Sequence, residues 1–311
     1  MRPMHTFGLA IAWEWEFDED FVRGIEHECH KRDISTYQIT PHNLPDVLRR
    51  IGRGELAFHG FYDRASDVDE SFLPLVKLLD RETVRVINPH HRVVHAIDKA
   101  TMHLEFLTHG LHVPYTIILS PHSVAREIHI APEELGHLGK PFVIKPANTT
   151  GGGTGVVLDA TTVNDVLKAR KLHPEDKYLL QEFIHPRVLD GKRAWFRVYS
   201  VFGESILCWW DDQTHEYTEM TGDKEQRFGL AGLREAIQTI YAISKLDFFS
   251  SEIAQEKSGE FIIVDYVNEI CDMRLKSKYS NGAPDAIVQH IEQLIAQEIE
   301  RHVAKLQEAK A

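Results

Sequence analysis

The stretch FVIKPANTTGGGTGVVL spans residues 142–158 and sets the main constraint on the fold. Its small residues leave backbone N–H groups free to approach phosphate oxygens. A P-loop would need a lysine directly after the glycines and then a helix, and a dinucleotide-binding fingerprint would also need a helix. Here the glycines are followed by Val156, Val157 and Leu158, which favour a strand. We therefore expect a glycine loop between two strands, either a flap over a triphosphate or a mobile hairpin tip.

The segment before this stretch alternates between strand and helix patterns. Asp18 is expected to cap a helix with one apolar face, formed by Phe21, Val22, Ile25 and Cys29. The other predicted elements are strands at 7–13, 37–39, 57–62 and 84–87 and a helix at 44–51. This alternation predicts a small parallel α/β domain up to about residue 90.

The rest of the chain is predicted to be strand-rich, with a long helix at its end. A helix begins near Asp98 and stops at Gly110, and a hairpin turns at Gly203. The predicted strands are 115–119, 142–145, 156–158, 178–184, 195–201, 205–210, 251–254 and 261–267, and the predicted helices are 162–171, 231–245 and 284–308.

Several short motifs follow one another in this part of the chain: Asn88-Pro89, Asp98-Lys99, Phe142 to Pro146 with the glycine loop, Leu180 to Ile184, Trp195 to Val198, and Val264 to Asn268. In order and spacing, residues 88–275 resemble the ATP-grasp superfamily, in particular the branch of ribosomal-protein glutamate ligases and related carboxylate–amine ligases. Over residues 1–87 the resemblance is architectural only. It implies an α/β (α+β) fold with an N-terminal domain (1–92), a subdomain with the glycine flap (93–177) and a C-terminal subdomain with the metal site (178–311).

The resemblance also assigns nucleotide-binding roles, with ATP as the cofactor. Lys99 and Lys145 match the two lysines that hold the phosphates, as ammonium groups can. The adenine-reading strand corresponds to Gln181, Glu182, Phe183 and Ile184, and Asp190 is a candidate for the ribose hydroxyls. The flap residues expected to cover the phosphates are Thr150, Gly151, Gly152, Gly153, Thr154 and Gly155.

The metal site departs from the family pattern. Related enzymes bind Mg²⁺ through an acid on one strand and Glu-x-Asn on the next, and Glu252 is the candidate for the first acid. Asp265 and Asn268 are separated by two residues rather than one, so a regular strand would place them on opposite faces. A β-bulge at residues 266–267 would bring both to Mg²⁺, with Mn²⁺ as an alternative ion. Otherwise Glu269 or Asp272 takes the place of one of them.

Two arginines are the candidate catalytic residues. Arg197 resembles the arginine that faces the transferred phosphate, and Arg274 borders the expected acceptor site. The predicted reaction activates a small-molecule or peptide carboxylate as an acyl phosphate, which an amine then attacks. A small-molecule kinase on the same fold and a non-catalytic nucleotide-binding regulatory module remain as alternatives.

Composition limits the other classes of function. The 311 residues contain 43% hydrophobic and 26% charged residues and carry a formal charge of -12, which argues against a nucleic-acid partner. No apolar run is long enough for a membrane span. The three isolated cysteines suit the cytoplasm, and a homo-oligomer is compatible with the sequence. The 19 histidines lack a metal-binding pattern such as HExxH, so we expect them to be solvated or hydrogen-bonded.

Overall fold

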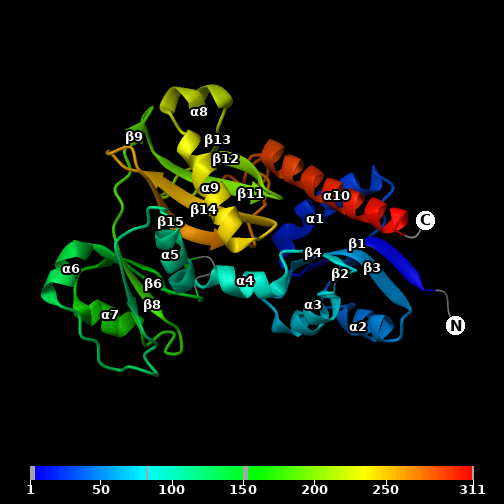
Figure 1. Ribbon diagram of the computed structural model, residues 1–311, viewed down its shortest axis with the longest axis horizontal. Helices are drawn as coiled ribbons and strands as arrows, with labels where there is room; N and C mark the ends of the chain where they lie inside the picture. The colour runs from blue at the N-terminus through cyan, green and yellow to red at the C-terminus, as the bar shows by residue number, and fades with distance from the viewer. Residues whose placement is uncertain (1–3, 82, 150–152, 310–311) are drawn as a thin grey trace.

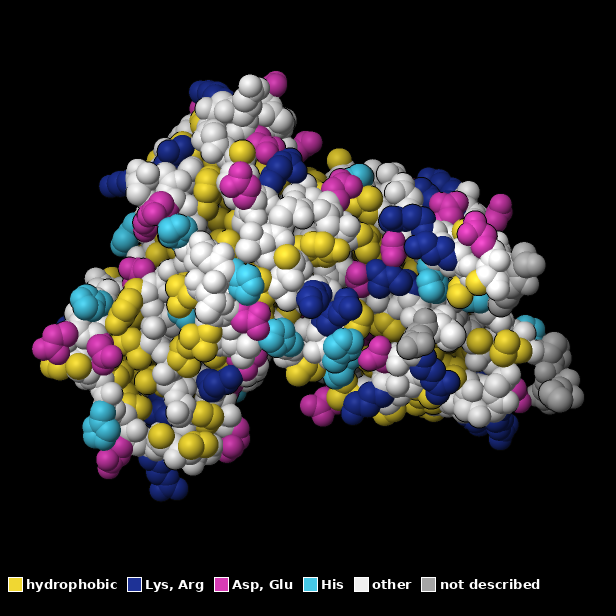
Figure 2. Space-filling model, viewed as in Figure 1, with side chains coloured by type: hydrophobic (Ala, Val, Ile, Leu, Met, Phe, Trp, Pro, Cys, Tyr) yellow, Lys and Arg dark blue, Asp and Glu magenta, His cyan; other side chains and the backbone are white. Residues whose placement is uncertain are grey.

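The computed structural model describes residues 4–81, 83–149 and 153–309 (Figure 1). These residues form three sheets of four or five strands and one short two-stranded hairpin. The three sheets are built mainly from the N-terminal, middle and C-terminal parts of the chain, respectively. The helices that the structure describes include none with the length and hydrophobicity needed to cross a bilayer. Basic and acidic side chains are intermixed over the face shown in Figure 2, and a notch separates the lobe of α6 and α7 from the N-terminal domain.

The N-terminal domain is built on a parallel sheet with the strand order β2-β1-β3-β4, as the alternating pattern predicts. Its elements are β1 (His5–Trp13), α1 (Glu19–His30), β2 (Thr36–Ile39), α2 (Leu44–Gly52), β3 (Leu56–Arg64), α3 (Leu73–Leu79) and β4 (Arg85–Ile87), with 3-10 turns at Glu16–Asp18 and Glu70–Phe72. Side chains alternate along β1: Leu9 and Ile11 pack toward α1 and the C-terminal helix, whereas Ala10 and Ala12 pack toward α2 and α3.

The second sheet is antiparallel and carries the glycine loop. Its strand order is β5-β8-β6-β7, and the predicted boundary at 177/178 falls just before its strand β8. The elements of this region are α4 (His90–Ile97), α5 (Lys99–Thr108), β5 (Thr116–Leu119), α6 (Pro132–Leu138), β6 (Phe142–Pro146), β7 (Val157–Ala160), α7 (Val163–Ala169) and β8 (Tyr178–Glu182). The helices α4 and α5 lie between this sheet and the N-terminal domain (Figure 1).

The third sheet is also antiparallel, with the order β13-β12-β11-β14-β15. Its hairpin turns at Gly203, as predicted, because Val201 pairs with Glu204. The elements are β9 (Val188–Leu189), β10 (Lys192–Arg193), β11 (Trp195–Val201), β12 (Glu204–Trp210), β13 (Tyr217–Glu219), α8 (Gly222–Phe228), α9 (Ala231–Ser244), β14 (Phe248–Gln255), β15 (Phe261–Asn268) and α10 (Asp285–Glu308). The last of these, α10, leaves the sheet and packs along α1 (Figure 1).

Buried polar contacts join the N-terminal domain to the third sheet. Asn88, which has a positive φ of 57°, exchanges two hydrogen bonds with the backbone of Phe248. Arg64 donates to both carboxylate oxygens of Asp18 at 2.8 and 2.6 Å and to the Cys271 carbonyl at 3.0 Å. The expected role of Asp18 is therefore wrong: its carboxylate caps no helix, because it is committed to the buried guanidinium of Arg64.

Glu292 is a buried carboxyl group between α10 and α1. It fits there because residue 24 is glycine: a Cβ on Gly24 would lie 2.1 Å from its Oε1. Burial raises the pKa of Glu292 to about 8, and the nearby Glu28 and Asp20 add to that rise. The folded protein binds the proton of Glu292 more tightly than the unfolded chain does. The free energy of unfolding therefore falls as the pH rises from the ordinary pKa of a glutamate toward 8.

We expect Glu292→Gln to remove this pH dependence. The variant should melt about 2–4 °C higher than the wild type at pH 8.5, and the difference should shrink toward pH 5. Thermal unfolding followed by circular dichroism at both pH values measures it. Glu300→Gln changes an exposed carboxylate of the same helix and is the matched control. A Tm difference for Glu292→Gln that is equal at both pH values would contradict the assignment.

Candidate active site

A row of charged side chains crosses the third sheet. Arg197 on β11 lies directly opposite Glu252 on β14, which in turn lies opposite Asp265 on β15. Directly paired residues of neighbouring strands project from the same face, so the three side chains meet. Arg197 donates to the Glu252 carboxylate and lies 4.8 Å above the ring of Trp210. The indole of Trp195 donates to the second Glu252 oxygen at 3.2 Å.

The last strand contains a β-bulge between Asp265 and Asn268, the first of the two arrangements that their spacing left open. Glu252 pairs with Asp265 and Ser250 with Asn268, so three steps along β15 oppose two steps along β14. The extra residue allows Asn268 to lie on the face that carries Asp265. In the orientation that satisfies both amide atoms, Asn268 accepts from Arg197 Nη1 and donates to the Ile270 carbonyl, each at 3.1 Å. The bulge at 266–267 is thus confirmed, and the choice of metal ligands among Asp265, Asn268, Glu269 and Asp272 stays a prediction.

Two lysines from outside the third sheet approach this row of charged side chains. Lys99 begins α5, whose N-terminus is capped by Asp98, and its Nζ lies 3.3 Å from Asp265 Oδ1. Lys145 stands on β6 and donates to the Val264 carbonyl at 2.9 Å. Both lysines are less than a tenth exposed. The structure therefore brings together the two lysines predicted to bind phosphates, one of the two arginines predicted to be catalytic, and the three predicted metal ligands.

The ionisation of the cluster follows from its charges. Burial alone would raise the pKa of Asp265, but Lys99, Lys145 and Arg197 hold it below its ordinary value. For Glu252 burial is the stronger effect, and its pKa is raised although Arg197 opposes the rise. Burial lowers the pKa of Lys145, and Asp265 counteracts it. Three cationic side chains facing two carboxyl groups leave an excess of positive charge, which suits a ligand with several negative charges.

The glycine loop joins two antiparallel strands, as predicted. Phe142 pairs with Ala160 and Ile144 with Val157, so the loop closes the β6–β7 hairpin. Gly153 and Gly155 have φ angles of 80° and 75°, in the left-handed region that favours glycine. Thr154 lies between them in the turn. The remaining predicted flap residues, Thr150, Gly151 and Gly152, lie outside the described residues.

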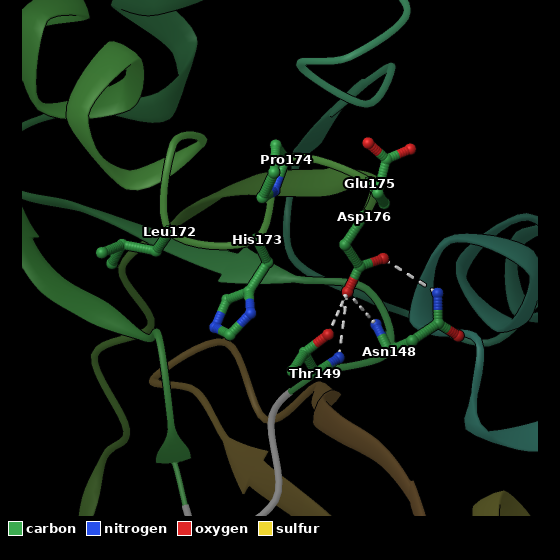
Figure 3. Close-up of a pocket in the computed structure, with 7 residues that line it drawn as sticks. All are labelled: Asn148, Thr149, Leu172, His173, Pro174, Glu175 and Asp176. Carbon is green, nitrogen blue, oxygen red and sulfur yellow. Dashed lines mark hydrogen bonds between the residues drawn. The ribbon is translucent and has the colours of Figure 1, made fainter.

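The described base of this loop is fixed by Asp176, a residue that the sequence does not single out. Its carboxylate accepts four hydrogen bonds of 2.9 Å, from the backbone and side chains of Asn148 and Thr149 (Figure 3). A hollow of about 410 Å³ lies beside it, between the loop base and residues 172–176. Acids before a strand are common, so only the tertiary contact distinguishes this one.

The residues predicted to contact adenine lie at the end of β8, whereas the residue predicted to contact ribose lies in another turn. Gln181 and Glu182 end β8, and Phe183 and Ile184 follow it. The amide of Gln181 donates to the Tyr266 hydroxyl at 2.7 Å, which connects it to the bulge. Asp190 lies in the β9–β10 turn with its carboxylate 3.8 Å from Arg227 of α8, so the structure places it beside that helix.

Arg274, the second predicted catalytic residue, has other partners. It donates to Asp272, with its Nη2 2.6 Å from Oδ2. Its guanidinium also lies 5.4–5.7 Å from the ring centres of Trp15, Phe17 and Tyr279. These contacts place Arg274 where the C-terminal segment meets the start of the N-terminal domain. The two arginines therefore have different carboxylate partners, Asp272 for Arg274 and Glu252 for Arg197.

The histidines do not form a metal centre among the residues that the structure describes. In those residues no group of three or more His, Cys, Asp or Glu side chains is arranged to hold a metal ion. His95 lies 2.9 Å from Glu105 and His91 lies 3.7 Å from Asp80, which agrees with the expected hydrogen-bonded or solvated state.

Comparison with solved structures identifies the arrangement of the three sheets. A RimK-domain ATP-grasp protein from Sphaerobacter thermophilus superposes with a TM-score of 0.64, over 93% of this chain and 98% of that one, at 17% identity. The chain has an ATP-grasp fold. The D-alanine–D-alanine ligase from Bacillus anthracis, complexed with ATP, gives a TM-score of 0.62 at 14% identity, over 96% of this chain and 99% of that one.

A third similar structure is that of the D-cycloserine synthetase DcsG, with a TM-score of 0.62 at 17% identity over 95% of this chain and all of the other. No family model matches the sequence, and neither does any curated protein sequence. The ATP-grasp architecture is thus kept at sequence identities too low for ordinary sequence comparison, which explains why the order of short motifs was the useful signal.

We expect Lys145→Met to weaken ATP binding while the fold persists. Losing a charge-assisted contact to a phosphate costs about 1.5–3 kcal/mol, roughly ten- to a hundredfold in Kd. Isothermal titration calorimetry with ATP measures the change, and the melting temperature reports the fold. Lys168→Met removes an exposed lysine of the same subdomain and should bind ATP as the wild type does. Equal affinities of Lys145→Met and the wild type would remove Lys145 from the site.

Proposed function

We propose that this protein is an ATP-dependent ligase that joins a small-molecule or peptide carboxylate to an amine, with Mg²⁺. The observation that carries the proposal is the meeting of Arg197, Glu252 and Asp265 on the third sheet with Lys99 and Lys145 from α5 and the second sheet. The cluster thus combines ammonium and guanidinium groups, which suit phosphate oxygens, with carboxylate oxygens, which suit a cation. The three buried, unpaired cysteines agree with a cytoplasmic location.

The oxygen donors fit a hard divalent cation. Glu252, Asp265 and Asn268 would hold it, since Mg²⁺ prefers carboxylate and amide oxygens and is usually completed by water and substrate phosphates. Two carboxylates and one amide are too few for a closed protein cage, which agrees with a metal that arrives with the nucleotide. The chemistry that the bound cation supplies is neutralisation of the charge on the nucleotide's phosphates.

The side chains would act mainly by binding and orientation. An oxygen of the substrate carboxylate attacks the γ-phosphorus, the bond to ADP breaks, and an acyl phosphate forms. The amine then attacks the carbonyl carbon, phosphate leaves, and the amine releases a proton. Arg197 would stabilise the negative charge that grows on the transferred group, and Lys99 and Lys145 would hold the phosphates in line.

The neighbours in structure support the ligase class. PsnB, an ATP-grasp ligase solved with a minimal precursor, Mg and ADP, has a TM-score of 0.62 at 13% identity over 93% of this chain. DcsG is named a synthetase, and the Bacillus anthracis enzyme joins two D-alanines according to its name. A small-molecule kinase on the same fold is the second candidate, and a nucleotide-binding module without catalysis is the third.

The fate of the γ-phosphoryl group separates ligase from kinase. We expect incubation of the protein with Mg·ATP and a metabolite or peptide mixture to release one phosphate for each condensation product, whose mass is the sum of two substrates less one water. Phosphate assay and mass spectrometry measure both. A stable phosphorylated product without free phosphate would assign the kinase, and nucleotide binding without turnover in any mixture would favour the regulatory module.

Arg197→Ala should lower kcat more than it raises KM for ATP. A residue that mainly stabilises charge in the transition state affects kcat, by about 10²–10³-fold for one such donor. Steady-state phosphate release gives both constants. Arg197→Lys keeps the positive charge beside Glu252 and should retain more of kcat than Arg197→Ala. A variant with normal kcat and a raised KM would assign Arg197 to ground-state binding of ATP instead.

A further inference from the structure

The bulge in β15 adds a residue whose side chain has its own partners. Between Asp265 and Asn268 the chain carries Tyr266 and Val267, where a regular strand with both ligands on one face would carry a single residue. Tyr266 is 2% exposed, so its hydroxyl group must find partners inside the protein.

Tyr266 packs in the core on the face of the third sheet that is opposite to the row of Arg197, Glu252 and Asp265, together with Phe106 of α5. Neighbouring side chains of a regular strand point to opposite faces. Here Asp265 and Tyr266 both contact α5, at Lys99 and His103, with an Nζ–Oδ1 distance of 3.3 Å and an Nδ1–hydroxyl distance of 2.7 Å. Lys99 and His103 are four residues apart and thus share one face of the helix. Because β15 is the edge strand of the third sheet, this helix face contacts two consecutive strand residues, one from each face.

The hydroxyl of Tyr266 connects three elements. Gln181 Nε2 on β8 can only donate, so at 2.7 Å the phenol oxygen accepts from it. The hydroxyl proton is then available to His103 Nδ1. Burial lowers the pKa of His103 to about 4, which keeps the imidazole neutral and able to accept. The same amide nitrogen of Gln181 donates to Thr116 Oγ1 at 3.1 Å, and the ring of Phe106 packs edge-on to Tyr266 at 5.2 Å.

We propose that Tyr266 is a positioning residue of the metal site. Its hydroxyl, held by Gln181 and His103, fixes the bulge in the form that turns Asp265 and Asn268 to the same side. The bond to Gln181 also ties this strand to β8, whose end leads into the segment expected to contact adenine. This inference rests on the proposed function, because the ligands that Tyr266 aligns are those assigned to Mg²⁺.

The test is Tyr266→Phe, which removes the hydroxyl and keeps the ring. We expect Mn²⁺ binding in the presence of a non-hydrolysable ATP analogue to weaken about tenfold, as is common when a group that orients a metal ligand is removed. Affinity for the analogue without metal should remain within about twofold of the wild type. Free Mn²⁺ followed by electron paramagnetic resonance gives the first Kd, calorimetry gives the second, and neither needs turnover.

Tyr178→Phe is the matched control. Tyr178 is a buried tyrosine of β8 whose hydroxyl donates to the Ala169 carbonyl at 2.8 Å, away from the bulge. It should bind Mn²⁺ as the wild type does. If Tyr266→Phe proves unstable, Gln181→Met removes the amide donor instead and should weaken Mn²⁺ binding in the same direction.

Wild-type Mn²⁺ affinity in both Tyr266→Phe and Gln181→Met would overturn the inference and leave the proposed function intact. An equal loss in Tyr178→Phe would also overturn it, because the effect would then belong to any buried hydroxyl. If the wild-type protein itself binds no Mn²⁺ with the analogue, the proposed function fails first and the role of Tyr266 fails with it.

Discussion

The central constraint on this molecule is the balance of charge around Asp265. Its side chain is half-buried, and Lys99, Lys145 and Arg197, which come from α5, the second sheet and the third sheet, hold its pKa below the ordinary value. Separating these elements would remove the charge partners that they supply to one another. The fold therefore holds the α5 and β6 lysines against the third sheet.

The rest of the architecture keeps that meeting point in place. Arg64 and Asp18 form a buried pair that also engages the Cys271 carbonyl just beyond the bulged strand, and Asn88 is bonded to Phe248 at the start of β14. These contacts anchor both strands of the carboxylate pair to the parallel sheet. On the other side, Asp176 fixes the base of the glycine loop through Asn148 and Thr149.

Strand and helix periodicity and the Gly203 turn predicted most of the elements, because these features depend on local pattern. The resemblance carried by the order of short motifs predicted the ATP-grasp fold and the candidate site residues, and the two-residue gap between Asp265 and Asn268 left the bulge as one of two possibilities. What was missed depends on contacts between distant residues. Asp18 has the sequence features of a helix cap, yet Arg64 is a stronger partner, and neither Asp176 nor the bonds of Tyr266 leave a local signal. The helices α3, α4 and α6 have only seven or eight residues each, which is too short for a helical period to show in the sequence.

The return of α10 to the N-terminal domain has a consequence for how the chain folds during synthesis. Leu9 and Ile11 on β1 are covered by α1 and by α10 residues such as Ile295 and Ile299, which are translated nearly 300 residues later. Until α10 leaves the ribosome, one face of the first sheet has only part of its cover. The N-terminal sheet is thus completed only after the other two sheets have been synthesised, and until then part of its apolar face is open to contacts with other chains.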